Sequence, residues 1–231
     1  DLSTGINMRP YPVPATDPIV YHRLPQQGDD NALAEAAASY YGAAGTDTLV
    51  LAPGSQALIQ WLPHLRGKTA RVGVVGPTYA EHASCWRRAG HDVARPASLD
   101  AAVQTSDVVV VVNPNNPDGR NYSPANLEAA ADALAAQGGW LVVDEAFADV
   151  TPAQSMVAHA GRDGLVVLRS FGKFFGLAGL RLGVAFAPPA LAQALRENIG
   201  PWAVAGPNGL IARQAYEDAE WQRAMRQQLS E

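Results

Sequence analysis

The sequence predicts an α/β fold in which a mostly parallel (mixed) sheet lies between two layers of helices. Six short apolar runs recur along the chain, Ala-rich segments with helical patterning separate them, and no internal repeat or low-complexity linker interrupts the alternation. Strands and helices that alternate in this way form a parallel sheet with helices on both faces. With 231 residues, 48% of them hydrophobic, the chain is long enough to bury one large core.

The apolar runs are predicted to be buried strands, since they are rich in Val and Leu and are bounded by turn residues. In chain order they span residues 47–51, 71–75, 107–112, 140–144, 165–169 and 182–187. The predicted helices between them span residues 31–41, 55–65, 79–89, 123–137 and 189–198. Ser123 and Gly138 mark the ends of the fourth helix as N-cap and C-terminal stop. From Pro207 onward we expect one long amphipathic helix.

Composition narrows the class of partner. A formal net charge of -5 gives no general attraction to nucleic acid or to an anionic membrane, and no apolar run approaches membrane-spanning length. The single cysteine, Cys85, excludes an internal disulfide and a Cys-rich metal site, and it fits a reducing cytoplasm. The five histidines show no metal-ligand spacing, so we expect no metal and a small molecule as partner.

Ligands of such sheets bind beyond the carboxyl ends of the strands, and four predicted strand ends carry polar groups. They are the helix start Gly54, Ser55 and Gln56, the turn NPNNPDG at residues 113–119, the carboxylate of Asp144, and the loop with Ser170 and Lys173. Taken singly, each has an ordinary alternative as an N-cap, a turn, a capping or ion-paired aspartate, or a solvated lysine.

Pyridoxal phosphate is a ligand that uses all four groups. Its aldehyde requires an amine such as that of Lys173, because a guanidinium stays protonated and is not a nucleophile. Its ring nitrogen requires a carboxylate such as Asp144 to stay protonated. Its phosphate suits a helix N-terminus and an arginine.

The stretch SFGKFFGLAGLR, residues 170–181, carries the resemblance to a known family. Lys173 follows Ser170 by three residues, and Arg181 follows the lysine by eight after a glycine-rich run. This pattern resembles that of the fold-type-I pyridoxal-phosphate enzymes of the class I/II aminotransferase superfamily. The resemblance implies the three-layer large domain of that fold. It also implies that Lys173 binds the cofactor covalently and that Ser170 and Arg181 hold its phosphate.

Other segments match the same family in order and spacing. By this resemblance Asn116 binds the phenolic oxygen of the cofactor, Asp144 binds the ring nitrogen, Tyr79 stacks on the ring, and His82 supports the aspartate. The start of the helix at Gly54, Ser55 and Gln56 is similar to the phosphate-binding helix start, although Gln56 stands where relatives often carry an acid.

The resemblance also implies a domain plan. Residues 1–30 would form an N-terminal substrate and dimer segment, 31–206 the large cofactor-binding domain, and 207–231 the start of a helix leading to a small C-terminal domain that is missing. The first residue is not Met, which suggests missing upstream residues as well. In the homodimer that the family implies, Gly5 and Asn7 are expected near the substrate, and 21–25 is expected to reach the neighbouring subunit.

Smaller features favour one branch of the superfamily. The opening DLSTGINMRPYPVP resembles both the histidinol-phosphate aminotransferases and their close relatives, the threonine-phosphate decarboxylases of cobalamin biosynthesis. Further segments, among them HRLP, PTYAEH and GPWAVAGPNG, together look most like the decarboxylases. Phe147 stands where aminotransferases commonly carry a tyrosine, although a packing role also explains a Phe. The resemblance implies decarboxylation of L-threonine O-3-phosphate to (R)-1-aminopropan-2-ol O-2-phosphate. The alternatives are an aminotransferase of the histidinol-phosphate type and a non-catalytic regulatory module that binds the cofactor, against which the lack of a basic DNA-binding region argues.

Overall fold

The computed structural model describes residues 5–230 and contains a seven-stranded sheet in the order β1-β7-β6-β5-β4-β2-β3. Its strands are β1 (Leu49–Ala52), β2 (Arg71–Val74), β3 (Asp92–Ala94), β4 (Val108–Val112), β5 (Trp140–Asp144), β6 (Leu165–Ser170) and β7 (Gly183–Phe186). Among these strands, β7 runs antiparallel to its neighbours β1 and β6, and the other pairs are parallel. The predicted mostly parallel, mixed sheet is confirmed.

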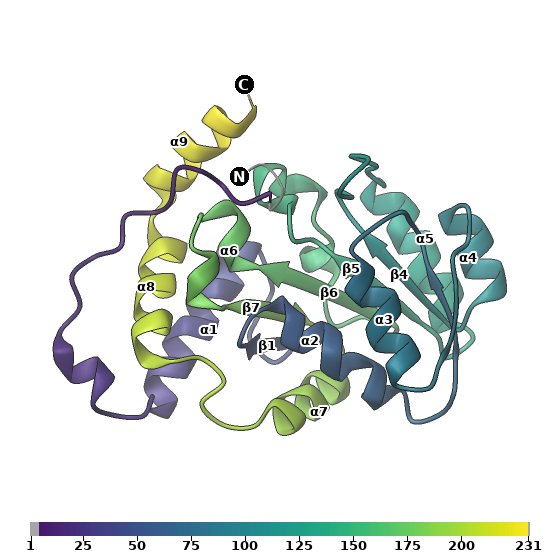
Figure 1. Cartoon of the computed structure of the whole chain (residues 1–231), viewed down its shortest axis with the longest axis horizontal. Coiled ribbons are helices and arrows are strands. Elements are labelled where there is room, and N and C mark those ends of the chain that lie inside the picture. Colours follow the sequence, from purple (N-terminus) through teal and green to yellow (C-terminus); the bar gives the residue numbers. More distant parts are fainter. Residues whose placement is uncertain (1–4, 231) are drawn as a thin grey trace.

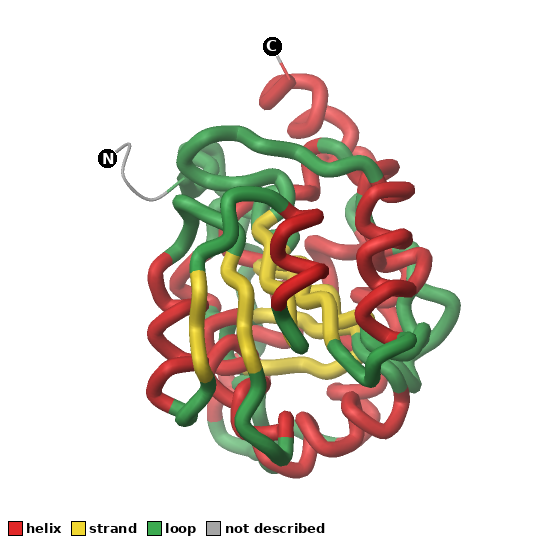
Figure 2. The backbone as a smooth tube through the Cα atoms, turned by 90° about the vertical axis from the view of Figure 1, so that its right-hand side faces the viewer, coloured by secondary structure: helices red, strands yellow, loops and turns green. Residues whose placement is uncertain are grey.

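Helices cover both faces of the sheet, which gives the predicted three layers (Figures 1 and 2). One face is covered by α1 (Gln27–Tyr41), α4 (Leu99–Thr105), α5 (Pro124–Ala135) and α8 (Gly206–Glu217), and the other by α2 (Ser55–Trp61), α3 (Ala80–Arg88) and α7 (Pro189–Ile199). A single turn, α6 (Phe171–Phe174), follows β6, and α9 (Ala219–Ser230) follows α8. Successive residues of β6 alternate between the two cores, Val167 on the α1 side and Val166 on the α2 side, as strand geometry requires.

The prediction of one continuous helix after Pro207 is wrong, because the chain bends at Asp218 between α8 and α9. Asp218 has a non-helical ψ of 76°, and its Oδ1 accepts a hydrogen bond of 3.0 Å from the Trp221 amide, as an N-cap does. Gln222 donates to the carbonyl oxygens of Ala215 and Tyr216 at 2.8 and 2.9 Å, so the end of α8 is satisfied by a side chain of α9.

Other boundaries also differ from the prediction. The expected helix over residues 55–65 is α2 followed by a 3₁₀ turn at Leu62–Arg66, since Pro63 has no amide hydrogen to continue an α-helix. The helix expected from residue 31 begins at Gln27, where Gln26 and Asp29 form a capping box. Strand β3 and helix α4 were not predicted, because both are short and β3 has no buried run.

The N-terminal segment lies over α6 before it passes around α8 to α1 (Figure 1). The Asn7 amide donates to the Lys173 carbonyl at 3.0 Å, the Asn7 side chain donates to the Phe174 carbonyl at 2.9 Å, and the Tyr11 amide donates to the Phe175 carbonyl at 2.8 Å. A helix of one turn leaves its last carbonyls without partners of its own, so residues 7–11 cap the turn that carries Lys173.

No helix within residues 5–230 has the length and apolar character needed to cross a membrane.

Candidate active site

The predicted site residues meet in one cavity of about 480 Å³ at the carboxyl ends of β4, β5 and β6, here called the strand-end cavity. Its lining includes Ser55, Gln56, Tyr79, Asn116, Asp144, Ser170, Lys173 and Arg181. Gly54 and His82 lie just behind this lining, Gly54 against Arg181 and His82 against Asp144. All the residues predicted to bind the cofactor are therefore brought together from the carboxyl ends of β1, β2, β4, β5 and β6 and from the segment that precedes β7.

Lys173 lies half-buried on the single turn α6, immediately after β6. Burial lowers the pKa of its amine, the guanidinium of Arg181 lowers it further, and the carboxylate of Asp144 opposes the shift. Its Nζ is 5.5 Å from the centroid of the Phe147 ring. A lowered pKa increases the fraction of neutral amine, which is the nucleophilic form.

Asp144 is a buried carboxylate paired with a buried imidazole. It is 4% exposed, His82 is 1% exposed, and Nε2 of His82 is 2.8 Å from Oδ2 of Asp144. An ionised carboxylate only accepts hydrogen bonds, so this imidazole nitrogen donates. The second oxygen, Oδ1, accepts from the Ala146 amide at 3.0 Å. These donors hold the carboxylate in place at the cavity wall.

The start of α2 and Arg181 form a cradle for an anion. Gly54 has a φ of 88°, and a β-carbon added there would lie 2.5 Å from Nη2 of Arg181. The guanidinium therefore lies directly over the backbone that begins α2, where the first amides have no partners within the helix. Arg181 itself has a left-handed backbone with φ of 50° and ψ of 58°, a conformation that costs a non-glycine residue about 1–2 kcal/mol. Strain of this kind is concentrated at functional sites.

The three asparagines of the NPNNPDG turn have different surroundings, and Asn116 is the one that the resemblance assigned to the cofactor. Asn113 is buried and exchanges hydrogen bonds with the Tyr122 backbone at 3.1 and 2.7 Å. Asn115 is also buried and donates to the Pro77 carbonyl at 2.9 Å. Asn116 is exposed and lines the strand-end cavity, so it is the one of the three placed to contact a ligand there.

Tyr79 stands at the mouth of the cavity as the residue before α3. It is 52% exposed, and its ring meets the His82 ring edge-on with centroids 6.1 Å apart. Its hydroxyl donates to Oε1 of Gln56 at 3.1 Å. Burial and the carboxylate of Glu81 raise the pKa of the Tyr79 hydroxyl, so it stays protonated as a donor.

Gly5 and Asn7 lie at an adjoining cavity of about 580 Å³, which shares Ile6, Phe147 and Lys173 with the strand-end cavity. Gly5 has a φ of 56°, and a β-carbon there would lie 2.9 Å from the Phe147 ring. The Asn7 side chain is turned toward α6. A substrate contact by Gly5 and Asn7 stays a prediction.

A buried ionic cluster, which was not predicted from the sequence, lies behind the site. Arg169 on β6 is 2% exposed and donates to Glu145 at 2.7 Å, while its other terminal nitrogen lies 3.0 Å from the carboxylate of Asp149. Tyr40 of α1 donates to the same aspartate at 2.8 Å. The sequence does contain a signal for this cluster. Arg169 interrupts the apolar run of β6, and a second acid, Glu145, directly follows Asp144.

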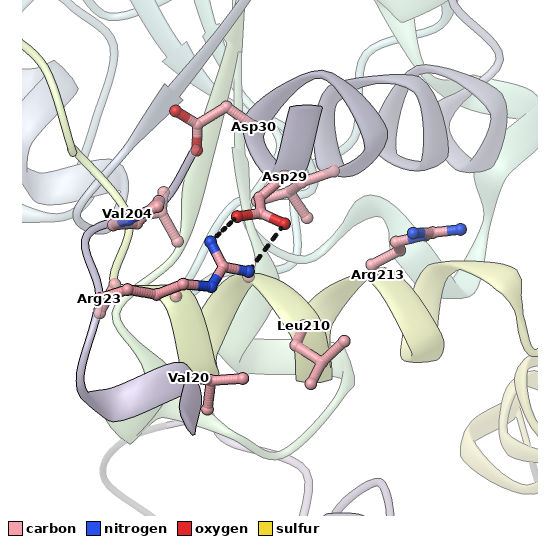
Figure 3. Close-up of a pocket in the computed structure, with 12 residues that line it drawn as sticks. Val20, Arg23, Asp29, Asp30, Val204, Leu210 and Arg213 are labelled. Atoms are coloured by element: carbon pink, nitrogen blue, oxygen red, sulfur yellow. Dashed lines mark hydrogen bonds and ion pairs between the residues drawn. The ribbon is translucent and has the colours of Figure 1, made fainter. Parts of the chain in front are cut away.

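A smaller pocket of about 80 Å³ lies between the N-terminal segment, α1 and α8, where Arg23 forms a two-point ion pair with Asp29 at 2.6 and 3.3 Å (Figure 3). Its described lining shares no residue with the strand-end cavity. Within residues 5–230, no three His, Cys, Asp or Glu side chains gather to hold a metal ion.

The family model and the related proteins that match this chain point to the same enzyme family. A model of the family described as aminotransferase class I and II matches residues 20–231. The chain is 50% identical over 225 residues to a threonine-phosphate decarboxylase of Pseudomonas aeruginosa, covering 96% of this chain and 66% of that protein. It is 47% identical over 214 residues to a threonine-phosphate decarboxylase of Sinorhizobium sp., covering 92% of this chain and 64% of that protein.

Among solved structures, the histidinol-phosphate aminotransferase from Sinorhizobium meliloti in complex with pyridoxal-5'-phosphate matches with a TM-score of 0.77 at 20% identity, covering 97% of this chain and 67% of that one. At 20% identity, this match shows that the two chains share a fold and nothing more. The chain thus spans about two thirds of the length of the proteins it matches.

Proposed function

Because the chain belongs to the aminotransferase class I and II family, we propose that it binds pyridoxal phosphate at the strand-end cavity and decarboxylates L-threonine O-3-phosphate. The products are (R)-1-aminopropan-2-ol O-2-phosphate and CO₂, and the proposed setting is cobalamin biosynthesis. The observation that carries the choice of reaction is the 50% identity to a threonine-phosphate decarboxylase across 96% of this chain.

The residues of the cavity fit this cofactor on grounds of their own chemistry. Lys173 offers an amine whose pKa is lowered by burial, which suits covalent attachment to an aldehyde. Asp144 offers a buried carboxylate at the wall, which suits a protonated ring nitrogen. Arg181 over the start of α2, together with Ser170, offers a cationic cradle that suits a phosphate.

The bound cofactor would supply an electron sink for the pair of electrons left at Cα when CO₂ departs. The side chains of the cavity would bind and orient the cofactor and would move the proton. Asp144, held by His82, would pair with the ring nitrogen, and Arg181 with the start of α2 would hold the phosphate. The amine of Lys173 would hold the cofactor covalently, and it is the group of the cavity that would return a proton to Cα. Tyr79 covers one side of the cavity mouth.

Phe147 supports decarboxylation over transamination. Its ring lines the cavity beside Lys173 and has no hydroxyl, whereas aminotransferases commonly carry a tyrosine at this position. The solved histidinol-phosphate aminotransferase with the same fold makes transamination the alternative to test.

We expect the protein loaded with pyridoxal phosphate to release CO₂ from L-threonine O-3-phosphate without any oxo-acid acceptor. The measurement is CO₂ release together with chromatographic detection of the phosphorylated amino alcohol. The control is L-threonine, which lacks the phosphate. Turnover that requires 2-oxoglutarate and yields an oxo acid would identify an aminotransferase instead.

We also propose that the protein is a homodimer in which the segment around Tyr21–Pro25 contacts the partner subunit. Ile19, Tyr21 and Leu24 are 52%, 66% and 61% exposed, which is unusual for three large apolar side chains so close in sequence. Light scattering after size-exclusion chromatography is expected to give twice the chain mass. A monomer mass at the highest concentrations tested would refute the proposal.

A further inference from the structure

We propose that Gln56 and Glu81 are positioning residues that hold the ring of Tyr79 over the strand-end cavity. Tyr79 was expected to stack on the cofactor ring, so this inference rests on the proposed function. The hydroxyl of Tyr79 donates to Oε1 of Gln56 at 3.1 Å, and Nε2 of Gln56 donates to Oε2 of Glu81 at 3.1 Å. The three side chains thus form a short chain of hydrogen bonds from the cavity mouth to α3.

Such a support would restrict Tyr79 because about half of the surface of this residue is exposed. Its ring also meets the ring of His82 edge-on, with centroids 6.1 Å apart. The hydroxyl lies at the far end of the ring, where one hydrogen bond restricts both side-chain torsions at once. The bond to Gln56 therefore limits where the ring face points before any ligand binds.

Glu81 determines which way the Gln56 amide faces. A carboxylate only accepts hydrogen bonds, so the amide nitrogen must face Glu81 and the amide oxygen is left for the tyrosine. Glu81 is itself held by Arg88, whose Nη2 lies 3.4 Å from Oε2. The orientation of Gln56 is thus fixed from α3.

The same geometry explains why position 56 is an amide in this chain. A glutamate at position 56 would face the carboxylate of Glu81 at about 3 Å, and like charges at that distance prevent both groups from ionising. It would also bring negative charge beside the start of α2, where the phosphate of the proposed cofactor would lie. An uncharged amide at position 56 accepts the hydrogen bond of Tyr79 without repelling Glu81 and without adding negative charge at the start of α2.

A double-mutant cycle on cofactor binding tests the inference. The dissociation constant of pyridoxal phosphate is measured by absorbance titration of the wild type, Gln56→Leu, Tyr79→Phe and the double variant. Losing one hydrogen bond at the hydroxyl is expected to raise the dissociation constant about fivefold in each single variant. Because both substitutions break the same bond, the double variant should bind as the single variants do.

Gln193 provides a matched control, since it makes the same amide-to-carboxylate bond, to Glu197 at 2.7 Å, on the exposed face of α7. Gln193→Leu should leave the dissociation constant unchanged. A second readout is the pH profile of Gln56→Glu. Its affinity relative to the wild type should recover as the pH falls, because the repelled carboxyl then takes up a proton and again resembles an amide.

The outcomes separate the inference from the proposed function. If the wild type does not bind pyridoxal phosphate, the proposed function fails. If the wild type binds it but Gln56→Leu binds equally well, or if the two single losses multiply in the double variant, Gln56 does not act through Tyr79 and the inference is overturned.

Discussion

Replacement of Lys173 by alanine is expected to abolish the visible absorbance of lysine-bound pyridoxal phosphate completely. The chain contains only two lysines, Lys68 and Lys173, and Lys173 is the one that lines the strand-end cavity. An alanine leaves no amine there, and Lys173→Arg should fail equally because a guanidinium stays protonated and does not attack the aldehyde. The measurement is the absorbance spectrum of the protein after incubation with the cofactor and removal of the excess.

Lys68 supplies the matched control, because it is exposed and lies in the loop before β2. Lys68→Ala should keep the full absorbance. Borohydride reduction followed by peptide mass analysis should place the cofactor on the peptide that contains Lys173. A reducible adduct that persists in Lys173→Ala would show that another group carries the cofactor.

Replacement of Arg169 by methionine is expected to cost about 3–5 kcal/mol of unfolding free energy, because it leaves two buried carboxylates without their cation. Glu145 is 0% exposed and Asp149 is 2% exposed, so neither can recover its interaction with water. Burial by itself lowers the pKa of the Arg169 guanidinium, but the carboxylates of Asp149 and Glu145 raise it above its ordinary value overall. Urea unfolding of the variant and the wild type measures the difference.

Arg71 offers a matched control on the surface, where it pairs with Asp107 at 2.8 Å and its side chain is 60% exposed. Arg71→Met should cost less than about 1 kcal/mol. Adding Glu145→Gln and Asp149→Asn to Arg169→Met should recover much of the loss, since no buried charge then remains unpaired. Equal losses for the Arg169 and Arg71 variants would contradict the expected role.

The Arg169 cluster also bears on the site, because it joins the two loops that carry the proposed chemistry. Glu145 directly follows Asp144, and Arg169 precedes Ser170 at the end of the neighbouring strand. Side chains alternate along a strand, so Asp144 faces His82 on one side of the sheet and Glu145 faces Arg169 on the other. The ends of β5 and β6 therefore carry the strand-end cavity on one side of the sheet and the ion pairs of Arg169 on the other.

Much of the fold follows from local pattern. All six apolar runs became strands, namely β1, β2, β4, β5, β6 and β7, within two residues of their expected ends, since burial on both faces requires such runs. The short edge strand β3 lacks that pattern, because its residues are exposed or half-buried and only its pairing with β2 makes it a strand. The bend at Asp218 was missed for a related reason. The apolar pattern continues through it, and the cap that ends α8 comes from a side chain of the next helix.

The sequence by itself determined which side chains stand at the strand ends, and with them Lys173, Asp144 and Arg181 as the groups to examine, because strand ends and chain order are local properties. Tertiary structure decided which of these groups meet and what supports them. It placed Asn116, which the resemblance had named, at the cavity, and it gave Asn113 and Asn115 backbone partners instead. It also joined Gln56 to Tyr79 and Arg169 to Glu145 across 23 and 24 residues of chain. Such pairs depend on how strands and helices pack in three dimensions, and no local sequence pattern records that packing.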